Sequence, residues 1–256
     1  MEKSFTLLQV AMDAAAKACR EILTVYHADD FDTELKHDNS PLTLADKISH
    51  EVILNHLQST GIPILSEEGK DIPYDIRKSW EFLWLVDPLD GTKEFLNRNG
   101  EFTVNIALIR EQQPVLGVVA VPAGGEVYFG GQGIGAFVRR NGADTVLHKR
   151  NPVDLKHTGL RIVASRSHLD NDTRAFIESL NNAEVVSRGS SLKFMMLAEG
   201  LADVYPRFAP TMEWDTAAAH AIIRQIGIKV INRATRQELH YNKPDLRNPS
   251  FLCIPE

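Results

Sequence analysis

The chain has 256 residues, 43% of them hydrophobic and 24% charged, with a formal net charge of −6. This composition is typical of a globular protein with one large core or two fused subdomains, and it argues against disorder. The negative charge, without a local basic stripe, argues against polymeric nucleic acid as a partner. The two cysteines, Cys19 and Cys253, stand at opposite ends of the sequence, which favours reduced thiols over a disulfide framework.

Hydrophobic runs along the chain stay shorter than the roughly 18 apolar residues of a membrane span. Charged residues also interrupt the first thirty positions, where a signal peptide would need an apolar segment. We therefore expect a cytoplasmic protein with no transmembrane segment. The sequence leaves open a peripheral attachment to the cytoplasmic face of the inner membrane, and it leaves open whether the chain is a monomer or a homodimer.

The first half of the chain predicts two helices and a sheet. Apolar residues recur every three or four positions from 4 to 26, the spacing of an amphipathic helix. A second helix is expected to start at Thr43, a capping hydroxyl that Asp46 follows three residues later. Apolar and alternating segments then predict strands of one sheet at 62–65, 82–86, 102–109, 115–121 and 126–129.

A second series of elements begins near residue 155, which predicts a subdomain boundary there. Strands are expected at 160–164, 202–205 and 229–231, and helices at 173–180, 191–199 and 216–226. Strands that alternate with helices in this way favour an α+β layered sandwich.

The most informative segment runs from Asp87 through Pro88, Leu89, Asp90 and Gly91 to Thr92. An apolar strand leads directly into two aspartates three positions apart, so both carboxylates can project into one space. The main-chain oxygen of Leu89 between them is a further ligand for a hard cation. The amides of Gly91 and Thr92 are expected to head a short helix, where phosphate binds readily. The alternative is a plain strand-to-helix turn in which Asp90 only caps the helix.

Other acids occur at corresponding positions. Glu67 and Glu68 follow the predicted strand at 62–65, Asp215 precedes the alanine-rich helix, and Asp46 stands in the first turn of its own helix. Each of these alone is most often a cap or a surface acid. Together they would repel one another by about 4 kcal/mol per pair at ~4 Å and an effective dielectric of about 20, so convergence requires protons or cations. Oxygen donors without histidine or cysteine at ligand spacing favour Mg²⁺ over zinc or copper.

The order of these motifs resembles the lithium-sensitive, Mg²⁺-dependent phosphatase superfamily that includes inositol monophosphatases and fructose 1,6-bisphosphatases. The resemblance implies an α/β/α/β/α sandwich. It also implies a subdomain at 1–155 with most of the metal ligands, and one at 156–256 with nucleotide recognition and the last ligand. Further segments, Asn99 to Asn105, Gly189 to Phe194 and Tyr205 to Phe208, are similar to the bacterial CysQ type of 3'(2'),5'-bisphosphate nucleotidase.

That resemblance implies hydrolysis of the 3'-phosphate of adenosine 3',5'-bisphosphate to AMP and phosphate, with the phosphosulfate form as a further substrate. An inositol- or sugar-phosphate monophosphatase is the alternative, and a non-catalytic metal-binding regulatory module is a third interpretation. The family pattern implies two or three Mg²⁺ ions.

Site roles carried over from the family fall on positions that match its motifs. The implied metal ligands are Glu67, Asp87, the Leu89 carbonyl, Asp90 and Asp215. The implied catalytic residues are Asp46, Thr92 and Glu67, with Asp46 and Thr92 orienting and deprotonating the attacking water. The implied substrate-binding residues are Gly91, Thr92, His168, Ser190, Lys193, Arg207 and Asp215. Structural interpretations compete for three of these: Lys193 as a surface lysine, His168 as a helix cap, and Arg207 as a loop residue.

Overall fold

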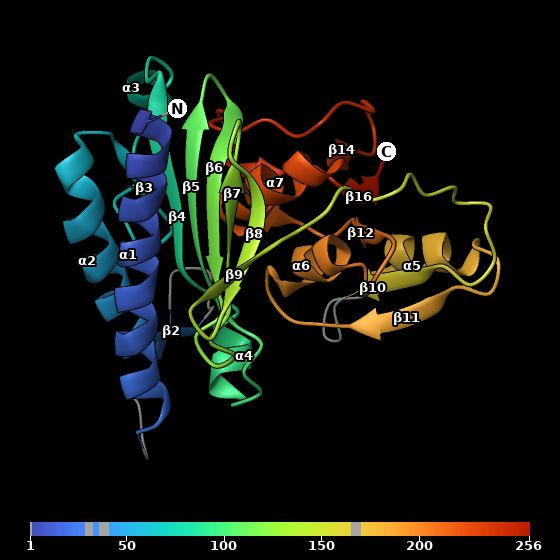
Figure 1. Ribbon diagram of the computed structural model, residues 1–256, viewed down its shortest axis with the longest axis horizontal. Coiled ribbons are helices and arrows are strands. Elements are labelled where there is room, and N and C mark those ends of the chain that lie inside the picture. The colour runs from blue at the N-terminus through green and yellow to red at the C-terminus, as the bar shows by residue number, and fades with distance from the viewer. Residues whose placement is uncertain (1, 29–32, 36–40, 165–169) are drawn as a thin grey trace.

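The structure, a computed structural model, describes residues 2–28, 33–35, 41–164 and 170–256. Five layers follow one another across the molecule (Figure 1). Two long helices cover one face of a large sheet, two buried helices cover its other face, and a second set of strands and an outer helix complete the stack. The predicted α/β/α/β/α sandwich is therefore confirmed.

Helices α1 (Glu2–Tyr26) and α2 (Leu44–Leu57) form the first layer. The predicted apolar stripe of α1 is buried, with Ala15, Ala18 and Ile22 fully shielded from solvent. At the start of α2, Thr43 accepts a hydrogen bond from the Asp46 amide, and the Asp46 carboxylate accepts one from the Thr43 amide. This reciprocal capping fixes where α2 begins. Strands β1 (Thr33–Leu35) and β2 (Pro41–Thr43) pair just before it.

The large sheet has seven strands in sequence order, with β3 parallel to β4 and every later neighbour antiparallel. Its strands are β3 (Ile64–Ser66), β4 (Phe82–Asp90), β5 (Thr103–Arg110), β6 (Gln113–Ala120), β7 (Val127–Gly131), β8 (Gly135–Arg140) and β9 (Ala143–Val146). The prediction of a single sheet is confirmed, and β8 and β9 extend it beyond the predicted strands.

The middle layer consists of α6 (Leu192–Glu199) and α7 (Ala217–Ile223), the latter continued by a short 3₁₀ turn, η3 (Arg224–Ile226). Helix α7 is buried along its whole length against β5 and β6. A side chain at Gly117 of β6 would lie 2.1 Å from the main-chain oxygen of Ala218, so the alanine-rich helix and the glycine permit this close approach.

The second set of strands joins distant segments of the C-terminal half. It contains β10 (Arg161–Ala164), β11 (Glu184–Ser187), β12 (Tyr205–Arg207), β14 (Ile228–Asn232) and β16 (Phe251–Pro255), and β13 (Thr211–Met212) pairs with β15 (Arg247–Asn248). Helix α5 (Asn171–Glu178) packs on its outer side. The strand predicted at 202–205 starts only at Tyr205 and runs on to Arg207. The short elements are η1 (Gln58–Thr60), α3 (Tyr74–Arg77), α4 (Thr92–Leu96) and η2 (Glu213–Asp215).

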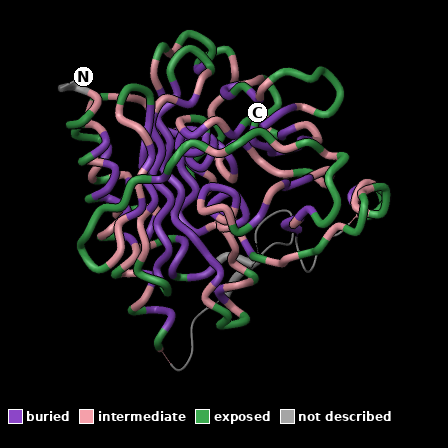
Figure 2. Tube along the Cα trace, turned by 45° about the vertical axis from the view of Figure 1, so that its right-hand side comes forward, coloured by how far each residue is buried: buried purple, intermediate pink, exposed green. Residues whose placement is uncertain are grey.

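Residues from both sides of position 155 share one core. Leu83 and Ala107 of the large sheet belong to the same buried cluster as Leu197, Ile222 and Cys253. Figure 2 shows the buried stretches running continuously through the large sheet. The division into subdomains 1–155 and 156–256 stays a prediction, and the shared core indicates that the two parts depend on each other for stability.

Candidate active site

The acidic residues gather where β3 and β4 end. Because these two strands are parallel, their carboxyl ends meet at one edge of the sheet, and the Glu67 amide donates to the Val86 carbonyl at 3.1 Å. Asp87 is paired with Asn105 of β5, and the register then shifts before Asp90. Such an irregularity interrupts the regular pairing, so that side chains at the end of the strand no longer alternate strictly between its two faces.

Three carboxylates meet at this edge. Glu67, Asp87 and Asp215 each offer an oxygen, and the three oxygens lie within 4.8 Å of one another. Asp215 comes from η2, more than a hundred residues along the chain, and its carboxylate accepts the Met212 amide at 2.9 Å. Burial, with the negative charges of Asp90 and Glu67, raises the pKa of Asp215 well above its usual value.

This donor set fits Mg²⁺. Carboxylate oxygens are the ligands that this ion prefers, and a carboxyl that resists ionisation beside two others marks a place where a cation stabilises the ionised form. The structure thus brings together three of the predicted ligands: Glu67, Asp87 and Asp215. Their role as ligands stays a prediction.

The turn between Asp87 and Asp90 is held from two sides. The Leu89 amide donates to Oδ1 of Asp87 at 3.1 Å, and the Ser49 hydroxyl donates to the Pro88 carbonyl at 2.7 Å. Leu89 itself is buried. These contacts fix the backbone that carries the predicted carbonyl ligand, and the use of that carbonyl by a cation stays a prediction.

Asp90 does not cap the following helix. The residue at the N-cap of α4 is Gly91, in a left-handed conformation with φ of 94°, and it makes no side-chain capping bond. The Asp90 carboxylate instead accepts hydrogen bonds from Ser190 and Ser191, across the site. The capping interpretation of Asp90 is therefore wrong.

Asp46 and Thr92 are in contact as expected. The Thr92 hydroxyl donates to Oδ1 of Asp46 at 3.3 Å, while Oδ2 of Asp46 is occupied by Thr43 in the helix cap. One oxygen of Asp46 therefore serves the helix cap and the other contacts Thr92, and the catalytic role of the pair stays a prediction. Thr92 begins α4 directly after Gly91, where the predicted phosphate cradle lies.

Cationic side chains from the C-terminal half approach the same acids. Lys193 on α6 is only 7% exposed, so its interpretation as a surface lysine is wrong. Burial, reinforced by Arg207, lowers the pKa of Lys193 to about 8, against the opposing influence of Asp90, Glu94 and Asp215. Its Nζ donates to the Arg188 carbonyl at 3.3 Å and lies 5.8 Å from the centre of the Tyr205 ring.

Arg207 ends β12 beside this lysine. Its Nη2 donates weakly to the Pro210 carbonyl at 3.4 Å, and its buried Nε has no hydrogen-bond partner in the described part of the chain. A buried guanidinium donor of this kind suits an anionic ligand. His168, the remaining predicted substrate contact, lies outside the described residues.

Several polar residues at the site were not predicted. Thr103 and Asn105 are buried on β5, two positions apart and therefore on one face of the strand. Glu101 accepts the Gly189 amide at 2.9 Å and pairs with Arg188. The sequence did offer a signal for Thr103 and Asn105: they are two polar residues in a strand that is otherwise apolar up to Arg110.

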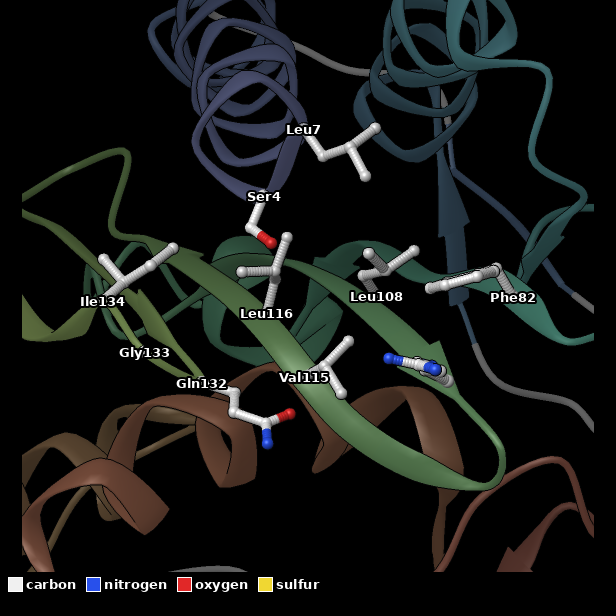
Figure 3. A pocket seen from close by; sticks show the side chains of 10 residues that line it. Ser4, Leu7, Phe82, Leu108, Val115, Leu116, Gln132, Gly133 and Ile134 are labelled. Carbon is white, nitrogen blue, oxygen red and sulfur yellow. The ribbon is translucent and has the colours of Figure 1, made fainter. Parts of the chain in front are cut away.

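A separate pocket of about 370 Å³ lies at the opposite end of β4, where Phe82 begins the strand. Figure 3 shows it between Ser4 and Leu7 of α1 and the strand residues Leu108 and Leu116. Its lining is mostly apolar and includes none of the predicted site residues.

The five-layer fold and the acidic edge define a class of protein, the metal-dependent phosphomonoesterases. Residues 5–253 match the family model described as the inositol monophosphatase family. The chain is 41% identical over 251 residues to the 3'(2'),5'-bisphosphate nucleotidase CysQ of Salmonella typhimurium. The alignment covers 96% of this chain and 98% of that protein. This chain belongs to the inositol monophosphatase family.

Solved structures agree with this assignment. The crystal structure of CysQ from Bacteroides thetaiotaomicron is 47% identical, with a TM-score of 0.84 over 97% of this chain and 96% of that one. An inositol monophosphatase/NADP phosphatase solved with Mg²⁺ and phosphate has a TM-score of 0.76, over 94% of this chain and 87% of that one. At 19% identity, the second comparison shows the shared fold alone. Among the described residues, no helix has the length and apolar character needed to cross a membrane.

Proposed function

We propose that this chain is a Mg²⁺-dependent phosphomonoesterase that removes the 3'-phosphate of adenosine 3',5'-bisphosphate, giving AMP and inorganic phosphate. The observation that carries the proposal is the convergence of Glu67, Asp87 and Asp215 at the edge where Thr92 contacts Asp46. The bisphosphate nucleotidase relatives at about 40% identity support the nucleotide as substrate. The phosphosulfate form of the nucleotide is proposed as a second substrate.

Glu67, Asp87, Asp215, Asp90 and the Leu89 carbonyl would hold two or three Mg²⁺ ions. Bound Mg²⁺ supplies acidity to a coordinated water and neutralises charge on the transferring phosphoryl group. The chain contributes placement, because these residues come from three separate segments: the residue after β3, the end of β4, and η2.

Proton movement is assigned to the Thr92–Asp46 pair. The Thr92 hydroxyl accepts the proton of the attacking water while it passes its own proton to Oδ1 of Asp46. The water oxygen then bonds to phosphorus, and the 3'-oxygen leaves with the electron pair of the broken bond and takes up a proton from solvent, while Asp46 returns its proton to solvent. This role depends on placement more than on acidity, and the placement is present, because the Thr92 hydroxyl already lies 3.3 Å from Oδ1 of Asp46.

Recognition of the second phosphate is assigned to Lys193 and Arg207. Both are cations beside the acidic edge, and Arg207 keeps a buried donor without a hydrogen-bond partner within the described ranges. Gly91 and Thr92 would hold the phosphate that is cleaved, and His168 and Asp215 stay predicted substrate contacts. The hydroxyl of Ser190, also a predicted contact, already donates to Asp90 at 2.5 Å.

The test is phosphate release from adenosine 3',5'-bisphosphate, inositol 1-phosphate and fructose 1,6-bisphosphate, with Mg²⁺ and then with added Li⁺. We expect the nucleotide to have the highest kcat/KM and Li⁺ to inhibit. Preference for inositol 1-phosphate would favour the monophosphatase alternative, and no release from any substrate would favour a regulatory module.

A further inference from the structure

The Asp90 carboxylate accepts four hydrogen bonds from the described residues. Its Oδ2 lies 2.5 Å from the Ser190 hydroxyl, 2.8 Å from the Ser191 amide and 2.9 Å from the Ser191 hydroxyl. Nδ2 of Asn105 is a fourth donor at 3.4 Å. Within the described residues, every hydrogen bond to this carboxylate falls on Oδ2, which leaves Oδ1 as the oxygen available to a cation.

Ser191 gives up a local hydrogen bond to make this contact. It is the N-cap residue of α6, a position where a serine hydroxyl usually accepts an amide of the first turn, yet it makes no such side-chain bond. Its hydroxyl lies instead 2.9 Å from Asp90 and 2.9 Å from the main-chain oxygen of Asp215. One buried side chain thus connects two residues of the acidic edge.

Asn105 sets the direction in which Ser191 donates. Nδ2 of Asn105 donates to the Ser191 hydroxyl at 2.9 Å, so that the single proton of the hydroxyl is free to point at an acceptor of the site. The Oδ1 atom of Asn105 is itself fixed, because it accepts the Thr103 hydroxyl at 3.2 Å. If the amide turned over, its oxygen would replace Nδ2 beside Oδ2 of Asp90, and Ser191 would have to donate to that oxygen instead of to the site.

The backbone beside this contact is strained. Ser190 has φ of 52°, in the left-handed region that a serine rarely adopts. The Ser190 hydroxyl is held by Asp90 at 2.5 Å and lies 2.6 Å from Thr103. A strained residue persists where its surroundings fix it, and such residues cluster at functional sites.

We infer that Ser191 and Asn105 are positioning residues for Asp90, which occupy Oδ2 so that Oδ1 is presented to the cation. The inference deepens the proposed function and rests on it for the identity of the cation. Partners that orient a metal ligand through its second oxygen are worth roughly 10- to 100-fold in metal affinity. Neither residue touches substrate in this account, so both act through Asp90.

The experiment measures metal binding directly, without turnover. Mn²⁺ is titrated into the EDTA-treated chain, and the electron paramagnetic resonance signal of the free ion gives the dissociation constant. We expect Ser191→Ala to weaken at least one Mn²⁺ site about tenfold. Ser191→Thr, which keeps the hydroxyl, should bind Mn²⁺ within about twofold of the parent chain. Asn105→Ala should weaken the same site as Ser191→Ala.

Ser179→Ala is the matched control. It removes a serine hydroxyl that donates to the Phe176 carbonyl at the end of the outer helix α5. Thermal unfolding of each variant confirms that the titrated protein is folded. Unchanged Mn²⁺ affinity in folded Ser191→Ala, or an equal loss in Ser179→Ala, would overturn the inference.

Phosphate release separates this inference from the proposed function. If Ser191→Ala weakens Mn²⁺ binding but the parent chain leaves adenosine 3',5'-bisphosphate intact, the positioning role stands and the proposed function fails. If the parent hydrolyses this nucleotide and Ser191→Ala binds Mn²⁺ normally, the proposed function stands and the positioning role fails.

Discussion

The buried lysine on α6 gives the sharpest prediction about substrate choice. Lys193→Met removes the charge, together with its contact to the Tyr205 ring, but keeps a long side chain that fills the same space. A charge-assisted hydrogen bond is worth about 1.5–3 kcal/mol, which corresponds to roughly 10- to 100-fold in affinity. We expect the KM for adenosine 3',5'-bisphosphate to rise by this factor.

The matched substrate is adenosine 3'-monophosphate, which carries the same scissile group and lacks the second phosphate. Its KM should change little in Lys193→Met, since the contact that is lost belongs to the 5'-phosphate. Lys229→Met is the control variant, because it removes an exposed lysine whose partner is Glu256. Equal KM increases for the two nucleotides would refute the assignment of Lys193 to the second phosphate.

The same lysine predicts a pH dependence. Since the pKa of Lys193 is lowered to about 8 by burial, its charged form is lost as the pH rises through that value. One unit above the pKa, about a tenth of these side chains stay protonated. The KM for the bisphosphate should therefore rise above pH 8, and Lys193→Arg should flatten the profile. A flat profile in the parent chain would contradict this.

Three further predictions concern the acidic edge. Thr92→Val removes the hydroxyl that relays the proton, so kcat should fall about 10²- to 10⁴-fold with little change in KM; steady-state kinetics decide, and an unchanged kcat would exclude the relay. Asp87→Asn should abolish phosphate release while circular dichroism shows a folded chain, and near-normal activity would show that Asp87 is no ligand. The raised pKa of Asp215 means that the metal-free folded chain binds more protons than the unfolded chain, so its stability should fall as pH rises from 3.8 through the folded pKa. Mg²⁺ should accordingly raise the unfolding temperature more at pH 8 than at pH 5, and an equal gain at both would refute this coupling.

Local sequence patterns predicted the parts of the fold that local forces determine. Thr43 and Asp46 form the cap that starts α2, and the alternating segment of β5 became a buried strand. Strand β16 was missed, although it is central to the second set of strands. Its partners Tyr205 and Ile228 lie far away in the sequence, and only the folded chain brings them beside Phe251–Pro255.

The same distinction between local patterns and contacts of distant segments applies to the site. The gathering of Glu67, Asp87 and Asp215 could be predicted because acidic residues at the ends of strands and the starts of helices form a pattern that the sequence displays. The role of Ser191 could not be predicted, because a serine before a helix indicates a local cap. The Asp90 carboxylate that it contacts instead lies a hundred residues earlier in the chain. Contacts that replace a local hydrogen bond with a distant one are visible only in three dimensions.

The most direct test of the account is the anomalous scattering of crystals soaked in Mn²⁺. We predict a peak among the carboxylates of Glu67, Asp87 and Asp215, with Oδ1 of Asp90 turned toward bound metal. Mn²⁺ bound only elsewhere, with these acids facing solvent separately, would contradict the claim that segments distant in sequence build one cation site.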